Sequence, residues 1–155
     1  MLISDFLNKD CIRVNMQCSE KEEVLKQLAE LQFSIHPEID REETMASLFE
    51  RENLLSTGIG EGIAIPHARI ESCTDILVSF GLLGSKVNFE SLDDKPVRIV
   101  LLILFPKDKV NLQLRFLARV SRVLHDTSLL EKILACSSPE EVVDTFRQYE
   151  ELHFH

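Results

Sequence analysis

The feature that most restricts the fold is a run of apolar residues, VRIVLLILF, at positions 97–105. A membrane-spanning helix needs roughly 20 such residues. This run is far shorter and contains Arg98, so we expect no membrane insertion. A short apolar run rich in β-branched residues is typical of a buried strand, and DILVSFGLL at positions 75–83 has the same character. The strands of the sheet should therefore concentrate between residues 63 and 105.

The first third of the chain combines one strand with two helices. Apolar and polar residues alternate over 12–16, which is the period of a strand with one buried face. SEKE at positions 19–22 is a capping-box pattern, and it predicts a helix over residues 20–33. DREE at positions 40–43 repeats the pattern and predicts a second helix that ends near Leu54.

The last third is predicted to be helical. Apolar residues recur on one face of residues 110–124, and a short helical segment follows at 128–135. Ser138 as the cap and Pro139 at the first helical position predict a final helix. Helices on both sides of the strands along the chain predict a single domain, residues 1–155, of the α/β class. Its architecture should be an α-β-α sandwich with a central mixed β-sheet flanked by helices.

The charge balance limits the partners. The chain carries 17 Lys and Arg against 26 Asp and Glu, a formal net charge of −9. Such a charge repels phosphate backbones, so we expect small solutes or proteins as partners and no nucleic acid. Charged residues interrupt the first ten positions, so no secretory leader is expected and the predicted location is the cytoplasm.

The cysteines indicate neither a zinc site nor a disulfide framework. They contain no CxxC pair and lie within predicted elements, at Cys11, Cys18, Cys73 and Cys136. We interpret them as reduced thiols in the core. No metal ion or cofactor is expected.

The segment STGIGEGIAIPH, residues 56–67, is the strongest candidate for a functional site in this sequence. Its glycines lack the GK[ST] ending of a nucleotide loop and lead into a strand, so a nucleotide site is not expected. They predict an open loop that lets another backbone or a partner protein approach closely. Pro66 is expected to end the short strand IAI and to place the imidazole of His67 at the rim of the sheet. The alternative is a structural histidine without a reactive role.

This segment closely resembles the active-site signature of the mannitol/fructose-type (type 2) enzyme IIA domains of the bacterial phosphoenolpyruvate-dependent sugar phosphotransferase system. The resemblance covers nearly the whole chain. The two capped helices before the segment, the opening LNKDC and the length look most like the stand-alone nitrogen-regulatory members. No permease part or IIB domain is attached in this sequence, which favours the regulatory branch. The resemblance implies the mannitol-type IIA fold.

The resemblance also implies a reaction. His67 would accept a phosphoryl group, on Nε2, from a histidine of an HPr-type phosphocarrier protein, and the partner downstream would be a regulatory target protein or a IIB domain. Transfer between two imidazoles asks mainly for positioning and for hydrogen-bond donors to the phosphoryl oxygens. Backbone N–H groups of Gly58, Gly60 and Gly62 are the expected phosphate-binding groups.

Arg51 matches the arginine that lies beside the phosphohistidine in this family. The helix pattern supports this placement independently, because Arg51 follows Leu48 by three residues and precedes Leu55 by four, near the predicted helix end. A full charge about 4 Å away is worth about 4 kcal/mol at an effective dielectric constant of about 20. The alternative role is to complement the helix dipole.

One position departs from the family. Active relatives usually carry a second histidine at the start of the helix over 110–124, where this chain has Gln113. Glutamine donates or accepts a hydrogen bond but cannot act as an imidazolium. Gln113 shares a helix face with Leu117 and Val120, so it could still point at His67. Phosphorylation would then be slower or lost, and the alternative function is a protein-binding module that signals without turnover.

Three further sequence features carry weaker functional implications. A basic stripe on the helix over 110–124 is either a docking surface or a solvated face; it consists of Arg115, Arg119 and Arg122. A hydrolytic dyad of Cys73 with His67 has no supporting motif. The remaining histidines show no metal-ligand spacing and receive no role, namely His36, His125, His153 and His155.

Overall fold

A mixed six-stranded β-sheet forms the centre of the computed structural model, which describes residues 1–54 and 56–154, without the side chain of Leu54. The strands are β1 (Ile12–Met16), β2 (Gly58–Gly60), β3 (Ile63–Ala64), β4 (His67–Ile70), β5 (Leu77–Val87) and β6 (Val97–Pro106). The α-helices are α1 (Lys21–Ile35), α2 (Arg41–Leu54), α3 (Val110–Val123), α4 (Thr127–Leu134) and α5 (Pro139–His153). Two short 3-10 helices precede β1, η1 (Ile3–Phe6) and η2 (Lys9–Cys11).

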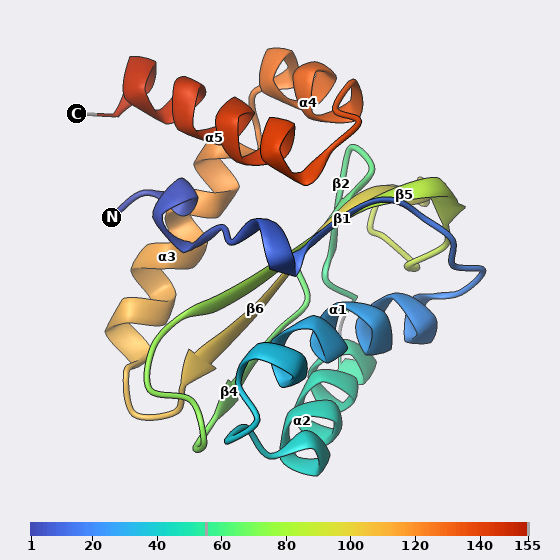
Figure 1. The fold of residues 1–155 in the computed structure, drawn as a ribbon. Coiled ribbons are helices and arrows are strands. Elements are labelled where there is room, and N and C mark those ends of the chain that lie inside the picture. The colour runs from blue at the N-terminus through green and yellow to red at the C-terminus, as the bar shows by residue number, and fades with distance from the viewer. Residues whose placement is uncertain (55, 155) are drawn as a thin grey trace.

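Helices cover both faces of the sheet, so the predicted α-β-α sandwich is confirmed. The sheet order is β1-β5-β6-β3-β2, and β4 also pairs with β6. Helices α1 and α2 lie on one face, and α3, α4 and α5 lie on the other (Figure 1). The sheet is mixed because β5 runs antiparallel to β6, whereas β3 and β4 run parallel to it.

The position of β6 in the middle of the sheet explains why the sequence of this strand is an almost continuous apolar run. Alternate side chains of a strand point to opposite faces, and here both faces are covered. Ile99, Leu101 and Ile103 pack into the core under α3 to α5, while Leu102 and Leu104 pack into the core under α1 and α2. The predicted buried strand is confirmed, and it lies between two separate cores.

The expected strand end at Pro66 is found to within one residue, because β3 ends at Ala64 and a separate strand, β4, begins at His67. Ile63 pairs with Ile99 and His67 pairs with Ile103, so β3 and β4 lie along β6 in one unbroken register. Proline lacks an N–H group and leaves out one bond of the ladder, but its carbonyl still accepts the N–H of Ile103 at 2.9 Å. His67 therefore begins a paired strand, and its backbone is held by the centre of the sheet.

The expected open glycine loop is an ordered hairpin. Strands β2 and β3 pair in antiparallel fashion, and the residues between them, Glu61 and Gly62, have φ angles of 56° and 78°. Positive φ at both central residues is what a two-residue type I′ hairpin requires. Gly58 is needed for another reason, because a Cβ atom there would lie 2.1 Å from Oγ of Ser91.

The helix caps agree with prediction in two of three cases. The expected caps form where the N–H of Glu43 donates to Asp40 (3.1 Å) and that of Glu141 to Ser138 (3.2 Å). The capping box of Ser19 with Glu22 is wrong. Helix α1 begins at Lys21, one residue later than predicted, and the Ser19 hydroxyl donates to Glu23 instead, at 2.7 Å.

The structure is consistent with the interpretation of the cysteines. All four are free; Cys11, Cys18 and Cys73 are buried, and Cys136 is partly exposed. No helix within the described residues has the length and apolar character to cross a membrane. Within the same residues, no group of three or more His, Cys, Asp or Glu side chains is arranged to hold a metal ion.

Candidate functional site

His67 lies in a surface cavity of about 310 Å³ formed by both halves of the chain. Its walls come from the end of α2, from the start of the β2–β3 hairpin, from the segment before β6 and from α3. The lining residues are Arg51, residues 56–59, Ile65, His67, Leu92, Leu117 and Ser121. An imidazole, a guanidinium and several hydroxyl groups therefore line one small cavity.

The hydrogen bond of the His67 ring determines which nitrogen can react. Nδ1 lies 2.8 Å from the carbonyl oxygen of Ile65. A carbonyl oxygen only accepts hydrogen bonds, so Nδ1 carries the ring proton and donates. In the neutral ring Nε2 then keeps its lone pair. The ring is half-buried and its edge packs against Phe105, with centroids 6.3 Å apart.

The surroundings of His67 keep the ring neutral. Its pKa is lowered from an ordinary value of 6.5, chiefly because burial disfavours the charged form. The hydrogen bond to Ile65 raises the pKa, the positive charge of Arg51 lowers it, and the negative charge of Glu52 raises it. Since the net direction is downward, the lowered pKa keeps the His67 ring neutral at pH 7.

Arg51 reaches the cavity from the last turn of α2. The structure thus brings together the two residues that the sequence singled out most strongly, Arg51 and His67. Their proximity is also expressed in the lowered pKa of His67, to which the Arg51 charge contributes. Leu55, the other apolar residue used to place Arg51, lies outside the described residues.

A buried carboxylate that the sequence analysis missed supports the cavity wall. Glu52 is only 4% exposed, and its Oε1 lies 3.5 Å from Nζ of Lys21 at the start of α1. Its two carboxylate oxygens accept the N–H of Thr57, at 3.1 and 3.2 Å. Thr57 in turn accepts the N–H of Ile65 at 3.0 Å through its carbonyl group. One carboxylate therefore joins α1, α2 and the hairpin below His67.

Of the three glycines predicted to bind phosphate, the structure brings only Gly58 to this cavity. The N–H of Gly58 already donates to Oγ of Ser56 at 3.1 Å. Gly60 and Gly62 lie at the turn of the hairpin, and the Gly62 carbonyl accepts N–H groups of the neighbouring β6 segment. Hydroxyl groups, which the sequence analysis did not consider, are the more prominent polar groups near His67.

Gln113 lies one turn before Leu117 on α3 but is not among the residues that line the cavity. Its side-chain Oε1 is buried and has no hydrogen-bond partner in the described part of the chain. Its expected position beside His67 remains a prediction.

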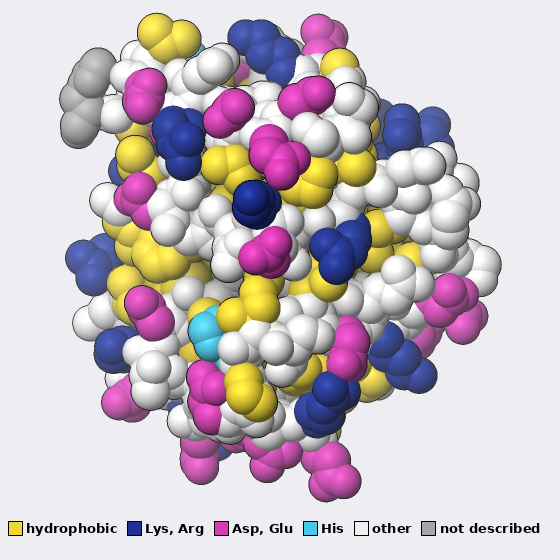
Figure 2. All heavy atoms as spheres, in the orientation of Figure 1, with side chains coloured by type: hydrophobic (Ala, Val, Ile, Leu, Met, Phe, Trp, Pro, Cys, Tyr) yellow, Lys and Arg dark blue, Asp and Glu magenta, His cyan; other side chains and the backbone are white. Residues whose placement is uncertain are grey.

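The basic stripe on α3 is not simply a solvated face. The guanidinium groups of Arg119 and Arg122 lie over the ring of Phe154, at 4.1 and 5.3 Å from its centroid. Arg115 is exposed. Figure 2 shows Lys and Arg side chains scattered among Asp and Glu over one face of the molecule, with no continuous basic surface there.

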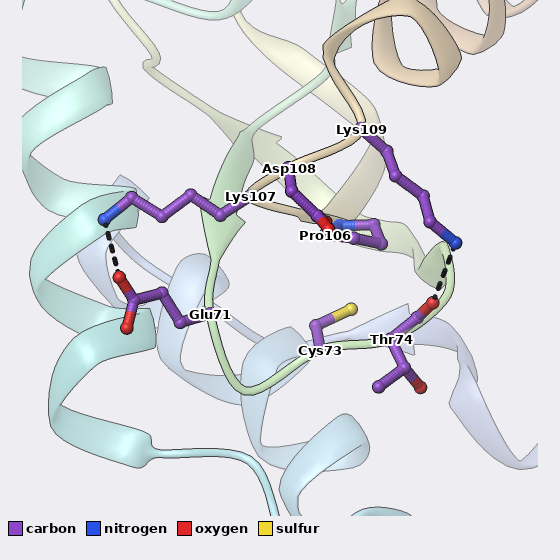
Figure 3. Close-up of a pocket in the computed structure, with 7 residues that line it drawn as sticks. All are labelled: Glu71, Cys73, Thr74, Pro106, Lys107, Asp108 and Lys109. Atoms are coloured by element: carbon purple, nitrogen blue, oxygen red, sulfur yellow. Dashed lines mark hydrogen bonds and ion pairs between the residues drawn. The ribbon is translucent and has the colours of Figure 1, made fainter.

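A larger cavity, of about 540 Å³, lies between the connection from β4 to β5 and the connection from β6 to α3 (Figure 3). Lys107 Nζ pairs with Glu71 at 3.4 Å, and Lys109 Nζ donates to the Thr74 carbonyl at 3.5 Å. The thiol of Cys73 lines this cavity, and burial raises its pKa. A protonated thiol is a poor nucleophile, and Cys73 does not share a cavity with His67, so the dyad is absent.

The other histidines show no site of this kind among the described residues. His36 Nδ1 lies 3.2 Å from a carboxylate oxygen of Glu38, and the His153 ring packs on Tyr149 with centroids 4.3 Å apart. His125 is exposed, and His155 lies outside the described residues. Of the histidines that the structure describes, His67 is thus the one that shares a cavity with a guanidinium.

Known proteins share the sequence pattern of this chain over most of its length. Residues 5–149 match the family described as phosphoenolpyruvate-dependent sugar phosphotransferase system, EIIA 2. The chain is 33% identical over 144 residues to the nitrogen regulatory protein of Escherichia coli, covering 90% of this chain and 86% of that one. It is 32% identical over 150 residues to the fructose-specific EIIABC component of Bacillus subtilis, covering 97% of this chain but only 24% of that protein's length.

Solved structures are similar over nearly the whole chain. The nitrogen regulatory protein IIA-Ntr from Neisseria meningitidis has a TM-score of 0.82 at 27% identity, covering 93% of this chain and 98% of that one. IIA mannitol from E. coli has a TM-score of 0.76 at 23% identity, covering 90% and 98%. The E. coli complex of enzyme IIAMTL with phosphorylated enzyme IIBMTL gives 0.77 at 22%, covering 92% and 97%. The two mannitol structures are similar in fold.

Proposed function

The chain belongs to the phosphoenolpyruvate-dependent sugar phosphotransferase system EIIA 2 family, and from this premise we propose that His67 accepts a phosphoryl group from an HPr-type phosphocarrier protein. The observation that carries the proposal is the state of the His67 ring. Its Nδ1 is held by the Ile65 carbonyl, its pKa is lowered, and its Nε2 is left with a lone pair in a cavity that Arg51 also lines.

The proposed step balances without a cofactor. The Nε2 lone pair of His67 forms a bond to phosphorus while the N–P bond of the donor histidine breaks, and that electron pair returns to the donor ring. Nδ1 of His67 keeps its proton, so the phosphorylated ring carries a positive charge. The Ile65 carbonyl oxygen, at 2.8 Å from Nδ1, stabilises this charge and fixes the ring for in-line attack.

Arg51 has an electrostatic task in this proposal. A phosphoryl group adds about 1.5 to 2 negative charges to a protein whose formal charge is already −9. A guanidinium offers several N–H donors in a planar fork that suits phosphoryl oxygens. Because the cavity is partly closed to water, its charge acts at a lower effective dielectric constant than in bulk solvent.

The partners are proposed to be proteins that dock over His67. Ile59 and Leu92 line the cavity and remain 46% and 80% exposed. Exposed apolar residues around a polar centre are typical of a docking surface. A similar fold forms a complex with a phosphorylated IIB protein, and several relatives are nitrogen regulatory proteins. We therefore assign a regulatory role of the nitrogen type, with a target protein or IIB domain downstream.

Gln113 supports a second candidate function, a protein-binding module with the IIA fold that is phosphorylated slowly or not at all. The family's usual second histidine is missing, and Gln113 does not line the His67 cavity. Such a module would bind its partner equally well as wild type and as His67→Ala. Loss of partner binding in that variant would exclude it.

The test is phosphorylation by the complete donor system. The protein is incubated with phosphoenolpyruvate, enzyme I and the host's own HPr-type carrier, and intact mass is measured. Wild type and the control His36→Gln, which changes a partly exposed histidine that does not line the cavity, should each gain one phosphoryl group. His67→Gln should gain none. A wild-type protein that stays unmodified would contradict the proposal.

A further inference from the structure

We propose that the hydroxyl group of Thr57 is a hydrogen-bond donor to the phosphoryl group carried by Nε2 of His67. This inference rests on the proposed phosphorylation of His67 and adds a residue to that site. Thr57 precedes β2 and lines the same cavity as His67 and Arg51.

The hydroxyl of Thr57 is buried without a partner. The residue is 4% exposed, and within the described residues its Oγ1 makes no hydrogen bond. Buried polar groups are nearly always paired, so an unpaired one needs an explanation. Three other buried side-chain atoms share this state, on Ser91, Gln113 and Arg119. None of those three residues lines the His67 cavity, so Thr57 is the one of the four that belongs to its wall.

The backbone of Thr57 is held on both sides. Its N–H donates to both carboxylate oxygens of Glu52, and its carbonyl accepts the N–H of Ile65. Glu52 is itself anchored by Lys21. Ile65 also holds the His67 ring through its carbonyl oxygen. Thr57 is therefore joined by one hydrogen bond to Ile65, which in turn orients the His67 ring through a second one. Such a fixed arrangement of donor and nucleophile is the preorganisation that stabilises a developing charge.

The other polar groups of the cavity cannot take this role equally well. Oγ of Ser56 donates to the Phe89 carbonyl and accepts the N–H of Gly58, so both its functions are used. Ser121 is exposed and competes with water. Arg51 supplies positive charge. Thr57 supplies a desolvated neutral donor, and a hydrogen bond from such a donor to an anionic oxygen is short and strong.

The magnitude follows from this geometry. Removing one preorganised donor from a charged oxygen typically costs a factor of roughly 10 to 100 or more in rate. Thr57→Val keeps the shape and deletes the hydroxyl, whereas Thr57→Ser keeps the hydroxyl. A matched control is Thr44→Val. Thr44 is fully buried in α2, and its hydroxyl is already used, donating to the Asp40 carbonyl at 2.8 Å.

The experiment measures two quantities for each protein: the rate of phosphorylation by the phosphorylated HPr-type carrier, and the midpoint of urea unfolding. Thr57→Val should be phosphorylated roughly 10- to 100-fold more slowly, with an unfolding midpoint equal to or above that of wild type, because no hydrogen bond is lost. Thr57→Ser should stay close to the wild-type rate. Thr44→Val should show the reverse, a wild-type rate and a lower midpoint.

Three results would overturn the inference. The first is a folded Thr57→Val protein as fast as wild type, and the second is a Thr57→Ser protein as slow as Thr57→Val. The third is a Thr57→Val protein that unfolds more easily than wild type or does not fold, because its hydroxyl would then have a structural partner. Failure of the proposed function gives a different signature, since wild type itself would remain unphosphorylated and the inference would fall with it.

Discussion

Replacing Glu52 by alanine is expected to weaken the fold and the cavity wall together. The carboxylate is almost fully buried, lies 3.5 Å from the Lys21 ammonium and accepts the N–H of Thr57 with both oxygens. The variant leaves Lys21 with no ion pair among the described residues, although its side chain is only 12% exposed. It also leaves a buried N–H group without an acceptor.

The magnitude follows from these two losses. Removing one partner of a buried ion pair costs about 3 to 5 kcal/mol, and an unsatisfied buried N–H costs about 1 to 3 kcal/mol. The two terms belong to one carboxylate and do not add, and Lys21 can reach water by a small movement of its flexible side chain. We therefore expect a loss of about 3 kcal/mol in the free energy of unfolding. For a chain of this size that lowers the melting temperature by roughly 6 to 12 °C.

Urea unfolding followed by circular dichroism measures this loss. Glu50→Ala, which changes an exposed residue two positions earlier in α2, is the matched control and should stay within about 0.5 kcal/mol of wild type. The double variant Lys21→Met/Glu52→Gln should be more stable than the sum of the single changes predicts, with a coupling energy of about 1 to 3 kcal/mol. A Glu52→Ala protein within about 1 kcal/mol of wild type, or strict additivity in the cycle, would refute this reasoning.

Further predictions concern the site and the opposite end of the molecule. Because burial lowers the pKa of His67, an NMR titration of the ring should give a midpoint below 6.5. The phosphorylation rate should fall only as the pH drops below that midpoint. A midpoint above 6.5 would contradict the burial assigned to the ring. Arg51→Ala should raise the titration midpoint of His67, since the guanidinium charge lowers it. The same variant should be phosphorylated at least tenfold more slowly, because it loses about 1.4 kcal/mol or more of charge stabilisation. An unchanged midpoint and an unchanged rate would show that the charge does not act on the ring. Glu150 is fully buried and accepts the N–H groups of Ile3 and Ser4 at 2.8 Å each. Glu150→Gln turns one oxygen into a donor, so it should lower the free energy of unfolding by about 2 to 4 kcal/mol in urea while leaving phosphorylation of the folded protein unchanged.

The sequence predicted the architecture well because the fold depends on patterns that a single chain displays. Strand β6 is buried between two cores. A strand that is buried on both faces has a continuous apolar sequence, which is easily recognised. The caps at Asp40 and Ser138 form because each requires only local geometry. At Ser19 two glutamates compete for one position, and the structure uses Glu23.

The sequence was less informative where pairing with a neighbouring strand modifies the local preferences of proline and glycine. Pro66 was predicted to end a strand, and β3 does end before it, but the sequence did not show that parallel pairing with β6 resumes at His67 in the same register. The glycine segment was predicted to be an open loop, yet the positive φ of Glu61 completes a hairpin turn. A non-glycine residue with positive φ is uncommon, so its sequence gives little warning.

The candidate site was predicted in part. His67 and Arg51 were identified through the family resemblance and the helix pattern, and they share a cavity. Glu52 and Thr57 were missed because a buried carboxylate in a helix and an unpaired hydroxyl are tertiary features. Glu52 is the neighbour of Arg51 in sequence, but adjacent side chains on a helix point in different directions. Only the packed structure shows that Glu52 holds Thr57, a residue of the cavity wall, through its backbone N–H.

The measurement that bears most directly on the central claim is the phosphorylation of His67 itself. Wild-type protein treated with phosphoenolpyruvate, enzyme I and the host's HPr-type carrier should gain one phosphoryl group in intact-mass spectra, and phosphorus NMR should show a phosphohistidine bonded through Nε2. A protein that remains unmodified, or that carries its phosphoryl group on any residue other than His67, would contradict the account.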